Sequence, residues 1–338
     1  MTIKEIAKET GYGISTVSRV LNNSGSVSDK TRMEINAVIE KYHFTPNVNA
    51  KHLKMQVKFG IAVIVKGIEN MLFLELTEAI QNKVRANGYE CLTYYIDEDS
   101  DEINEARKIQ VERRPYGFIF LGADANIYHR RLEIKDLNVP CILITDNSVT
   151  FGIGNLSSIG IDDSLAAANV IDYLYRHGHT KIGIIGGNPD KSNPSRMRLE
   201  GCELAFIKHD IDFDIKNQYS ASRFSLEGGY KAAENLLDKF PDVTAIFAMS
   251  DIMAIGAMRA IYNSGRKIPA DISIMGFDGI ELARYVHPRL TTVRQNVERM
   301  AERGTEIMLE CIKNPTEEIH ELVSFSLIEG SSVADITG

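Results

Sequence analysis

The polar side chains best suited to recognising another molecule lie close to the N-terminus, between residues 14 and 21. Ser15, Thr16, Ser18 and Arg19 alternate with apolar residues at helical spacing, so a helix here would bury one face and expose the polar one. An exposed guanidinium can fork onto O6 and N7 of guanine, and hydroxyls can bind bases or phosphates. A solvated helix face is the alternative interpretation of this pattern.

The surrounding residues predict a small domain of three helices. Thr2 and Glu5 have the spacing of a capping box, and Gly11-Tyr12-Gly13 forms a turn before the second helix, residues 14–21. Ser28 caps a third helix. The expected apolar positions are Ile3, Ile6 and Ala7, with Thr10 on the same face; Ile14, Val17, Val20 and Leu21; and Ile35, Val38, Ile39 and Tyr42. Two helices joined by a tight glycine turn are typical of a helix-turn-helix, whose second helix enters a DNA major groove.

Charge is unevenly divided along the chain of 338 residues, whose net charge is -8. Residues 1–58 contain nine Lys/Arg and five Asp/Glu, a balance of +4, which leaves -12 for the remainder. A basic head on an acidic body predicts that only the head contacts phosphates. Uneven charge on two ordinary domains is the alternative.

Three runs of the head carry a specific resemblance: residues 2–11 (TIKEIAKETG), 15–22 (STVSRVLN) and 27–32 (VSDKTR). With Pro46-Asn47 and the following residues 50–53 (AKHL), they resemble the head and hinge of the LacI/GalR family of bacterial repressors. The expected divisions are a head over residues 1–47, a hinge helix over 48–58 and an effector-binding core over 59–338.

The resemblance implies a homodimer, possibly paired into a dimer of dimers, whose heads read the half-sites of palindromic operator DNA. Residues 48–55 would fold as a helix on DNA, with Leu53 wedged into a minor-groove step and Lys54 beside it. Packing of Leu53 on its own head is the alternative. The residues implied to approach bases are Ile14, Ser15 and Arg19; those implied to approach phosphates are Thr2, Thr16, Ser18, Asn22, Ser28 and Thr31; Asn47 and Ala50 complete the DNA-binding set.

One position of the head departs from the family pattern. The family usually has Val-Ser where this chain has Tyr12-Gly13, so the hydroxyl that caps the second helix and contacts a phosphate is missing. Glycine is still an acceptable N-cap. The departure therefore removes one expected phosphate contact and leaves the motif intact.

From residue 59 onward, apolar runs alternate with amphipathic segments, which predicts parallel sheets with crossover helices. Two units of similar size predict two doubly wound α/β lobes facing a shared cleft. Expected strands are 59–65, 90–95, 116–121, 141–145, near 159, 182–186, 245–248 and 273–277; expected helices are 73–86, 101–113, 128–137, 165–177, 198–209, 226–240 and 252–264. The core resembles the periplasmic-binding-protein-like core of the same family, which implies crossings near 160, 292 and 323, an N-lobe of about 59–160 and 293–322, and a C-lobe of about 161–292 and 323–338.

Charged groups at strand ends and an aromatic plane are the features that hold a polyol once water is excluded. Arg198, Asp251 and Asp278 lie at such places and match effector positions of the family. A capping role is the alternative for Asp278, and a helix N-terminal role is the alternative for Asp251. The remaining expected effector residues are Phe73, Asp146, Phe224, Ser250 and Gln295.

The effector class is narrowed by residues 70–73, where Asn70-Met71-Leu72-Phe73 replaces the family's usual Asn-Pro-Phe-Phe. A reduced stacking platform favours a sugar over a purine, so a repressor of carbohydrate-utilisation genes is expected, with a corepressor-dependent nucleoside or purine regulator as the alternative. A transporter's solute-binding protein would carry an export signal and no basic head. An enzyme is not expected, because the chain has no P-loop, HExxH, GxSxG or GxGxxG motif in the required context.

The remaining features predict a cytoplasmic protein, associated with the nucleoid when bound to operator, without a metal or cofactor. Cys91, Cys141, Cys202 and Cys311 are dispersed without metal-ligand spacing and are expected to be reduced core thiols. No apolar stretch is long enough to span a membrane, and no signal peptide is evident.

Overall fold

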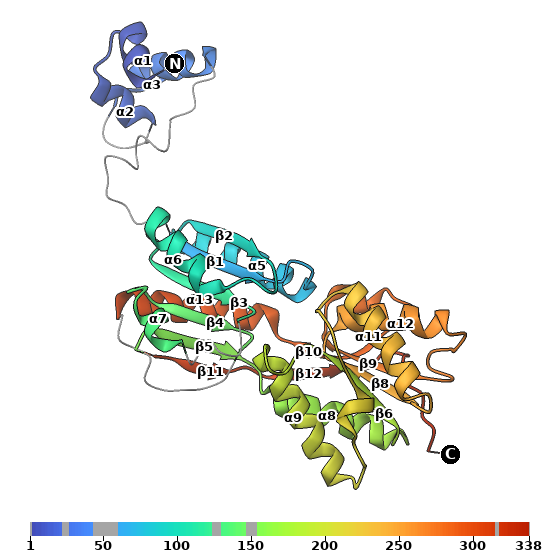
Figure 1. Cartoon of the computed structure of the whole chain (residues 1–338). Helices are drawn as coiled ribbons and strands as arrows, with labels where there is room; N and C mark the ends of the chain where they lie inside the picture. Colours follow the sequence, from blue (N-terminus) through green and yellow to red (C-terminus); the bar gives the residue numbers. More distant parts are fainter. Residues whose placement is uncertain are drawn as a thin grey trace. The chain divides into compact units, whose positions relative to one another are not determined.

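The structure is a computed structural model that describes residues 2–21, 27–42, 60–123, 130–146, 154–314 and 318–337 (Figure 1). The chain divides into two compact units, Met1–Val57 and Lys58–Gly338. The hinge expected over residues 48–58 lies outside the described residues. Among those that are described, no helix is long and apolar enough to cross a membrane.

The first unit contains three helices, α1 (Ile3–Thr10), α2 (Ile14–Leu21) and α3 (Asp29–Lys41), as predicted. The capping box at the start of α1 is present, and Ser28 caps α3. Ile6, Val17 and Ile35 are fully buried where the three helices meet. The expected burial of Ile14 is wrong: it is 47% exposed, because the first residue of this eight-residue helix lies beyond the surface that the other helices cover.

The first sheet of the core has the strand order β11-β5-β4-β3-β1-β2, with every neighbouring pair parallel. Its strands are β1 (Ile61–Lys66), β2 (Cys91–Ile96), β3 (Gly117–Leu121), β4 (Cys141–Ile144), β5 (Leu156–Gly160) and β11 (His320–Leu322). Its helices are α5 (Met71–Ala86), α6 (Glu102–Arg113), α7 (Arg131–Lys135) and α13 (Val297–Lys313). Strands covered by helices on both faces are continuously apolar, which explains the IAVIVK sequence of β1.

The second sheet has the order β12-β10-β9-β8-β6-β7 and is parallel except for the pairing of β10 with β12. Its strands are β6 (Ile182–Gly186), β7 (Tyr219–Ala221), β8 (Ala245–Ala248), β9 (Ser273–Asp278), β10 (Thr291–Gln295) and β12 (Phe325–Ile328). The helices of this lobe are α8 (Asp163–Arg176), α9 (Asn193–Lys208), α10 (Ile215–Gln218), α11 (Leu226–Lys239), α12 (Asp251–Asn263) and the 3-10 helix η1 (Glu281–Arg284). The two predicted doubly wound lobes are thus confirmed.

The chain passes between the sheets after β5, after β10 and after β11 (Figure 1). The second passage lies at Asn296 and not near residue 292, because residues 291–295 pair with both β9 and β12 in the second sheet. Helix α9 begins at Asn193, five residues before the predicted start, since Ser192 caps it and Pro194 occupies its first turn. Of the helix expected at 128–137, the described part is α7; residues 124–129 lie outside the described residues.

The four cysteines carry free thiols, of which Cys141, Cys202 and Cys311 are buried and Cys91 is half-buried. Burial raises the pKa of the Cys141 and Cys202 thiols, so both remain protonated at neutral pH. The interpretation as core thiols therefore fits three of the four.

Candidate DNA-binding head and effector cleft

Helix α2 presents the polar stripe predicted for DNA recognition. Val17 and Val20 point into the head, which leaves Ser15 and Arg19 exposed and Thr16 and Ser18 half-buried on the other side of the helix. Because Ile14 is also exposed, it can reach a base edge and does not serve the core of the head.

Thr2 and Ser28, two of the residues predicted near phosphates, lie at helix N-termini, where backbone N–H groups favour anions. Thr2 Oγ1 accepts from the Glu5 N–H at 3.3 Å, and Glu5 Oε2 accepts from the Thr2 N–H at 2.7 Å. Ser28 Oγ accepts from the Thr31 N–H at 3.3 Å and lies 2.8 Å from the Thr31 hydroxyl. These residues therefore hold the first turns of α1 and α3 in the free head. Five other predicted DNA-binding residues lie outside the described residues: Asn22, Asn47, Ala50, Leu53 and Lys54.

Tyr12, where the chain departs from the family pattern, has a structural partner. Its hydroxyl donates to Oε2 of Glu34 on α3 at 2.5 Å, which ties the turn to the third helix. Sequence reasoning noted the missing serine and missed this bond, because a contact across 22 residues has no local signal.

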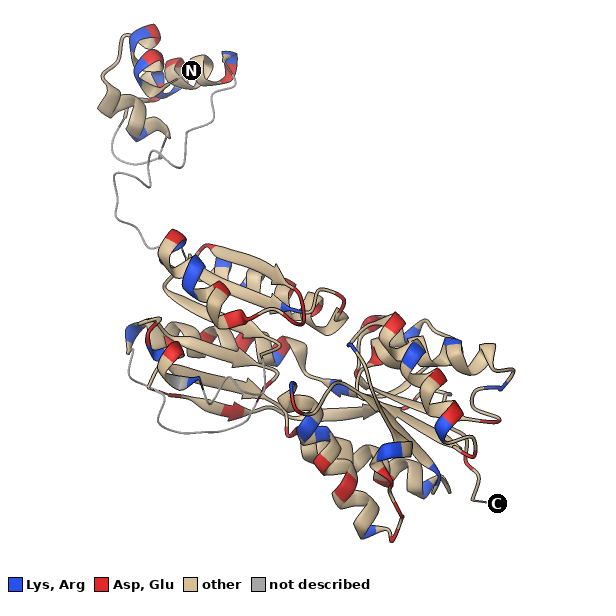
Figure 2. Cartoon of the chain, in the orientation of Figure 1, with Lys and Arg blue, Asp and Glu red and all other residues tan. Residues whose placement is uncertain are grey.

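Most of the net positive charge of residues 1–58 falls on residues that the structure does not describe. Residues 2–42 contain six Lys/Arg and five Asp/Glu, and both signs appear on the helices in Figure 2. The other three basic residues counted within 1–58 are Lys51, Lys54 and Lys58, which lie outside the described residues. The attraction for phosphates inferred from charge thus depends mainly on the segment that joins the head to the core.

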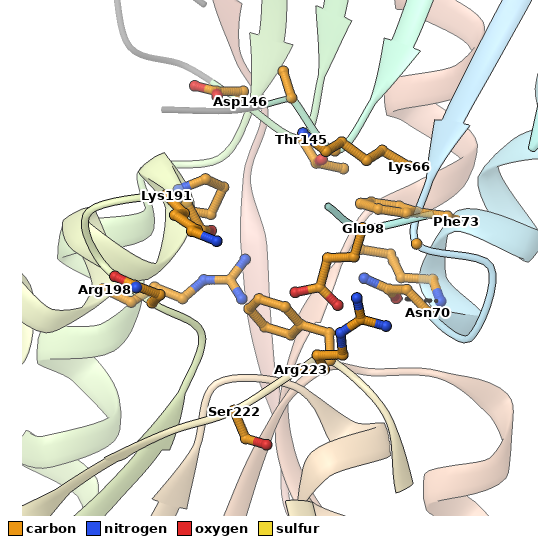
Figure 3. Close-up of a pocket in the computed structure, with 18 of the residues that line it drawn as sticks. Lys66, Asn70, Phe73, Glu98, Thr145, Asp146, Lys191, Arg198, Ser222 and Arg223 are labelled. Atoms are coloured by element: carbon orange, nitrogen blue, oxygen red, sulfur yellow. Dashed lines mark hydrogen bonds between the residues drawn. The ribbon is translucent and has the colours of Figure 1, made fainter. Parts of the chain in front are cut away.

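A cavity of about 480 Å³ lies between the two lobes of the core, at the carboxyl ends of strands from both sheets (Figure 3). Among the described residues, five predicted effector residues line it: Phe73, Asp146, Arg198, Phe224 and Asp278. The other three, Ser250, Asp251 and Gln295, do not. Residues of the lining that sequence reasoning missed include Lys66, Asn70, Glu98, Asn188, Lys191, Ser192, Ser222 and Arg223.

Arg198 is held in the cavity wall by groups of its own lobe. Its Nε donates to Oδ1 of Asp163 at 2.8 Å, and its Nη1 donates to the Met249 carbonyl at 2.5 Å. Its guanidinium carbon lies 3.8 Å from the centroid of the Phe277 ring. Burial raises the pKa of Asp163 to about 6 and the Arg198 charge opposes this shift, so the pair is mainly ionised at neutral pH. These contacts fix the direction of the guanidinium group of Arg198 and leave its other N–H groups available to donate to a ligand in the cavity (Figure 3).

Asp278 ends β9 with a positive φ of 109° and is 3% exposed. Its Oδ1 accepts from Nε2 of Gln295 at 2.9 Å, so Gln295 orients the carboxylate without reaching the cavity itself. The remaining acceptor capacity of Asp278 can take a donor from a ligand hydroxyl.

Ser250 and Asp251 follow β8, yet both bond within the protein. Ser250 Oγ accepts from the Met253 N–H and caps α12. Asp251 is fully buried, and its carboxylate accepts from the Ile280 N–H at 2.8 Å and from the Thr292 hydroxyl at 2.6 Å. This geometry supports the alternative structural role of Asp251 at the N-terminus of a helix.

Two aromatic rings supply apolar faces to the cavity, Phe73 from α5 and Phe224 from the segment before α11. Each ring lies against a glycine. A Cβ atom at Gly122 would lie 2.7 Å from the Phe73 ring, and one at Gly187 would lie 2.6 Å from the Phe224 ring. Because Gly122 also has a φ of 75°, its replacement would disturb both the backbone and the ring.

Several lining residues that the sequence analysis missed lie at or just after the end of a strand, and this position could have identified them as candidates. Lys66 ends β1, Glu98 follows β2, Asn188 follows β6, and Arg223 follows β7. In an open α/β sheet, ligands bind at the carboxyl ends of the strands, so each polar residue directly after a predicted strand was a candidate. Recognising Arg223 also required β7, which the sequence pattern did not reveal because it has three residues.

Asp278→Asn is expected to stabilise the protein more at pH 8 than at pH 5. Burial raises the pKa of Asp278 to about 7; Arg198 and Gln295 oppose this, and the acidic groups of Asp163 and Glu75 add to it. The folded protein therefore keeps a proton that the unfolded chain releases above its usual pKa of 3.8, so this group's contribution to stability is lost progressively as the pH rises from 3.8 to about 7. Asparagine cannot ionise, and it tolerates positive φ better than most residues.

Thermal unfolding of both proteins at the two pH values measures this effect. We expect the free energy of unfolding of the variant, relative to that of the unmodified protein, to be higher at pH 8 than at pH 5 by on the order of 1–3 kcal/mol. The exposed Asp212→Asn is the control and should show no such difference between the two pH values. An equal effect of Asp278→Asn at both values would contradict the expectation.

Known protein families match both the head and the core of the chain. The family model for bacterial regulatory proteins of the lacI family matches residues 2–47, and a periplasmic binding protein-like domain matches residues 171–333. The HTH-type transcriptional regulator MalR of Clostridium butyricum is 34% identical over 99% of this chain and 100% of its own length. The probable HTH-type transcriptional repressor ExuR of Bacillus subtilis is 33% identical over 93% and 92%, respectively.

Solved structures share the fold. A lac repressor dimer bound to operator and the anti-inducer ONPF has a TM-score of 0.78 at 22% identity, with 99% of each chain covered. The complex of the transcriptional regulator CelR with cellobiose has a TM-score of 0.71 at 23% identity, covering 98% of this chain and 99% of that one.

A helix-turn-helix head joined to a two-lobed α/β core with a cavity between the lobes defines a DNA-binding transcriptional regulator. MalR is 34% identical to this chain over 99% of the chain's length, and the lacI-family model matches the head of the chain. The chain therefore belongs to the LacI family of bacterial regulatory proteins.

Proposed function

We propose that this protein represses carbohydrate-utilisation genes and that a sugar bound between its core lobes controls its affinity for operator DNA. The observation that carries the proposal is the cavity between the lobes, which combines an oriented arginine, carboxylates and two aromatic faces. This combination suits a polyol, whose hydroxyls need both donors and acceptors. The complex of CelR with cellobiose supports a sugar.

On DNA, the protein acts as a homodimer whose two heads occupy the half-sites of a palindromic operator. Arg19 and Ser15 read bases, together with Ile14. Phosphate contacts come from Thr2, Thr16, Ser18, Asn22, Ser28 and Thr31. The hinge over residues 48–58 folds on the operator, with Leu53 in a minor-groove step, and Asn47, Ala50 and Lys54 lie beside it.

In the core, the effector contacts Arg198 and Asp278 in the C-lobe and Phe73 in the N-lobe, together with Asp146 and Phe224, the two other predicted residues that line the cavity. The ligand changes operator affinity only if it binds the two lobe arrangements unequally. We propose that the protein binds its ligand without converting it. We propose further that the protein acts in the cytoplasm and on the nucleoid, and that two dimers can pair.

Removal of residues 1–58 tests whether the head alone binds the operator and the core alone binds the ligand. The core has its own hydrophobic clusters, so it should fold and bind ligand without the head. We expect the truncated protein to lose all specific affinity for a palindromic site selected from random-sequence duplexes by the full-length protein. Retained specific binding would overturn the assignment of the head.

A thermal-shift screen of the full-length protein against mono- and disaccharides tests the effector. Each sugar that raises the melting temperature is then added to an operator-binding titration. A fall in operator affinity identifies an inducer, and a rise identifies a corepressor. If no sugar shifts the melting temperature, or if the protein turns a sugar over, the proposed function is wrong.

A further inference from the structure

Every cation that the described residues place in the cavity wall already has a carboxylate partner. Two of the pairs are buried: Lys66 Nζ lies 2.8 Å from Glu102, and Arg198 lies 2.8 Å from Asp163. Two lie at the rim and join the lobes: Arg223 bonds to Asp97 at 3.0 Å and also to Asp99, and Lys191 lies 3.5 Å from Asp99. The loop after β2 in the N-lobe thus neutralises both C-lobe cations at the rim.

Two carboxylates of the wall have no such partner. Among the described residues, no lysine or arginine nitrogen lies within 4.0 Å of the carboxylate of Glu98 or Asp278. The bond that Asp278 makes to Gln295 comes from a neutral amide. Glu98 extends into the cavity from the N-lobe side and Arg198 extends from the C-lobe side (Figure 3). Glu98 is half-buried, and burial raises its pKa, while the Arg223 charge and the Phe224 N–H oppose the shift.

We propose that this charge arrangement makes Glu98 a specificity-determining residue, which selects a neutral or amino-bearing sugar and rejects the corresponding sugar acid or phosphate. The inference rests on the proposed function, because it specifies the ligand of the same cavity. Sequence reasoning did not assign Glu98 to the site.

The selection follows from the partners that each ligand would find. Hydroxyl and ammonium groups can both donate to Glu98 and Asp278, and the hydroxyl groups can also accept from the free donors of Arg198. A ligand carboxylate or phosphate finds no cation without a partner among the described residues. It would have to displace Asp163 or Glu102 from a buried pair, or compete with Asp97 and Asp99 at the rim, while lying near the carboxylate of Glu98 and near Asp278, which adds a second like charge as the pH rises above 7.

Matched ligands measure the selection directly. Full-length protein is titrated calorimetrically with glucose, galactose and ribose, with glucuronate and galacturonate, with the 6-phosphates of both hexoses and the 5-phosphate of ribose, and with glucosamine and galactosamine. We expect the neutral or amino member of the best-bound set to bind at least about 10-fold more tightly than its acidic counterparts. Tighter binding of an acid or phosphate would overturn the inference and leave a sugar-responsive regulator standing. If none of these compounds binds, the sugar found in the thermal-shift screen is compared in the same way with its own acid and phosphate; a screen without any hit overturns the proposed function, and this inference fails with it.

Variants then test Glu98 itself. Glu98→Gln keeps the size of the side chain and removes its charge, so the ratio of neutral to acidic affinity should fall at least about 3-fold. Glu98→Asp keeps the charge and should retain most of the ratio. The matched control is Glu112→Gln, an exposed carboxylate on α6 outside the cavity wall, which should leave the ratio unchanged. Unfolding curves of all three variants report folding. If the Glu98→Gln variant folds and keeps the wild-type ratio of neutral to acidic affinity, Glu98 does not determine the specificity.

Discussion

Arg19→Ala is expected to weaken binding to the selected operator by roughly 30- to 20,000-fold. A bidentate contact to guanine contributes about 1–3 kcal/mol of discrimination, and a symmetric dimer loses it in both half-sites. Arg19 is exposed in the last turn of α2, whereas the core of the head consists of Ile6, Val17 and Ile35. The variant should therefore fold normally, and the loss should be confined to DNA binding.

Electrophoretic titration of operator and of scrambled duplexes, at several salt concentrations, separates base reading from phosphate attraction. Arg19→Lys keeps the charge and should preserve the affinity for scrambled DNA while losing part of the preference for the operator. Lys8→Ala removes one exposed charge from α1 and is the matched control, with an expected effect of only a few-fold. If Arg19→Ala weakens operator and scrambled DNA by the same factor and reduces the salt dependence, Arg19 contacts a phosphate and not a base.

The head was predictable because its signals are local. The spacing of Thr2 and Glu5 predicts the start of the first helix, and Ser28 as an N-cap predicts the start of the third; both starts are where the structure has them. Ile14 shows where local reasoning ends. Its spacing from Val17 predicts burial, but burial also requires a neighbour to cover the helix end, and α1 and α3 do not reach it.

The two-lobed core was likewise predictable from alternating strands and helices, whereas the crossing after β10 was not. That boundary depends on the pairing of Thr292 with Gly276 on one side and Ile328 on the other. Such pairings join residues far apart in the sequence. The antiparallel strand β12 has four residues and carries no repeated pattern of its own.

Strand ends located the cleft correctly, but they did not give side-chain direction. Arg198 and Asp278 line the cavity, while Asp251, at an equivalent place after β8, turns toward the Ile280 N–H and the Thr292 hydroxyl. The rim pairs were unpredictable for a related reason. Asp97 and Arg223 belong to different lobes, so their contact depends on how close the two lobes lie.

Arg198→Lys is expected to weaken sugar binding by roughly 10- to 100-fold, because a hydrogen bond to a charged group contributes about 1.5–3 kcal/mol. Nε and Nη1 of Arg198 are already bonded to Asp163 and to the Met249 carbonyl, so only the remaining donors of the fork can serve a ligand. A lysine has a single nitrogen, which the Asp163 carboxylate would hold. It also lacks the planar group that lies over the Phe277 ring.

Lysine is a better test than alanine, because alanine would leave Asp163 buried without its partner, at a cost of about 3–5 kcal/mol. Calorimetric titration with a sugar identified in the screen measures the loss. The control is Arg176→Lys at the exposed end of α8, which should bind like the unmodified protein. Unchanged sugar affinity together with a lowered melting temperature would assign Arg198 to the support of Asp163 alone.

Titrations of the Arg198→Lys variant with operator DNA distinguish a loss of ligand affinity from a loss of the ligand's effect on operator affinity. All three partners of Arg198 belong to the C-lobe, so it moves with that lobe, whereas Glu98 and Phe73 approach the ligand from the N-lobe. A ligand held from both sides favours the arrangement in which the lobes lie close together, and this difference in affinity is what drives a response. Arg198→Lys should therefore shift the response to higher sugar concentrations with an unchanged maximum, whereas a reduced maximum would mean that Arg198 also distinguishes the two arrangements.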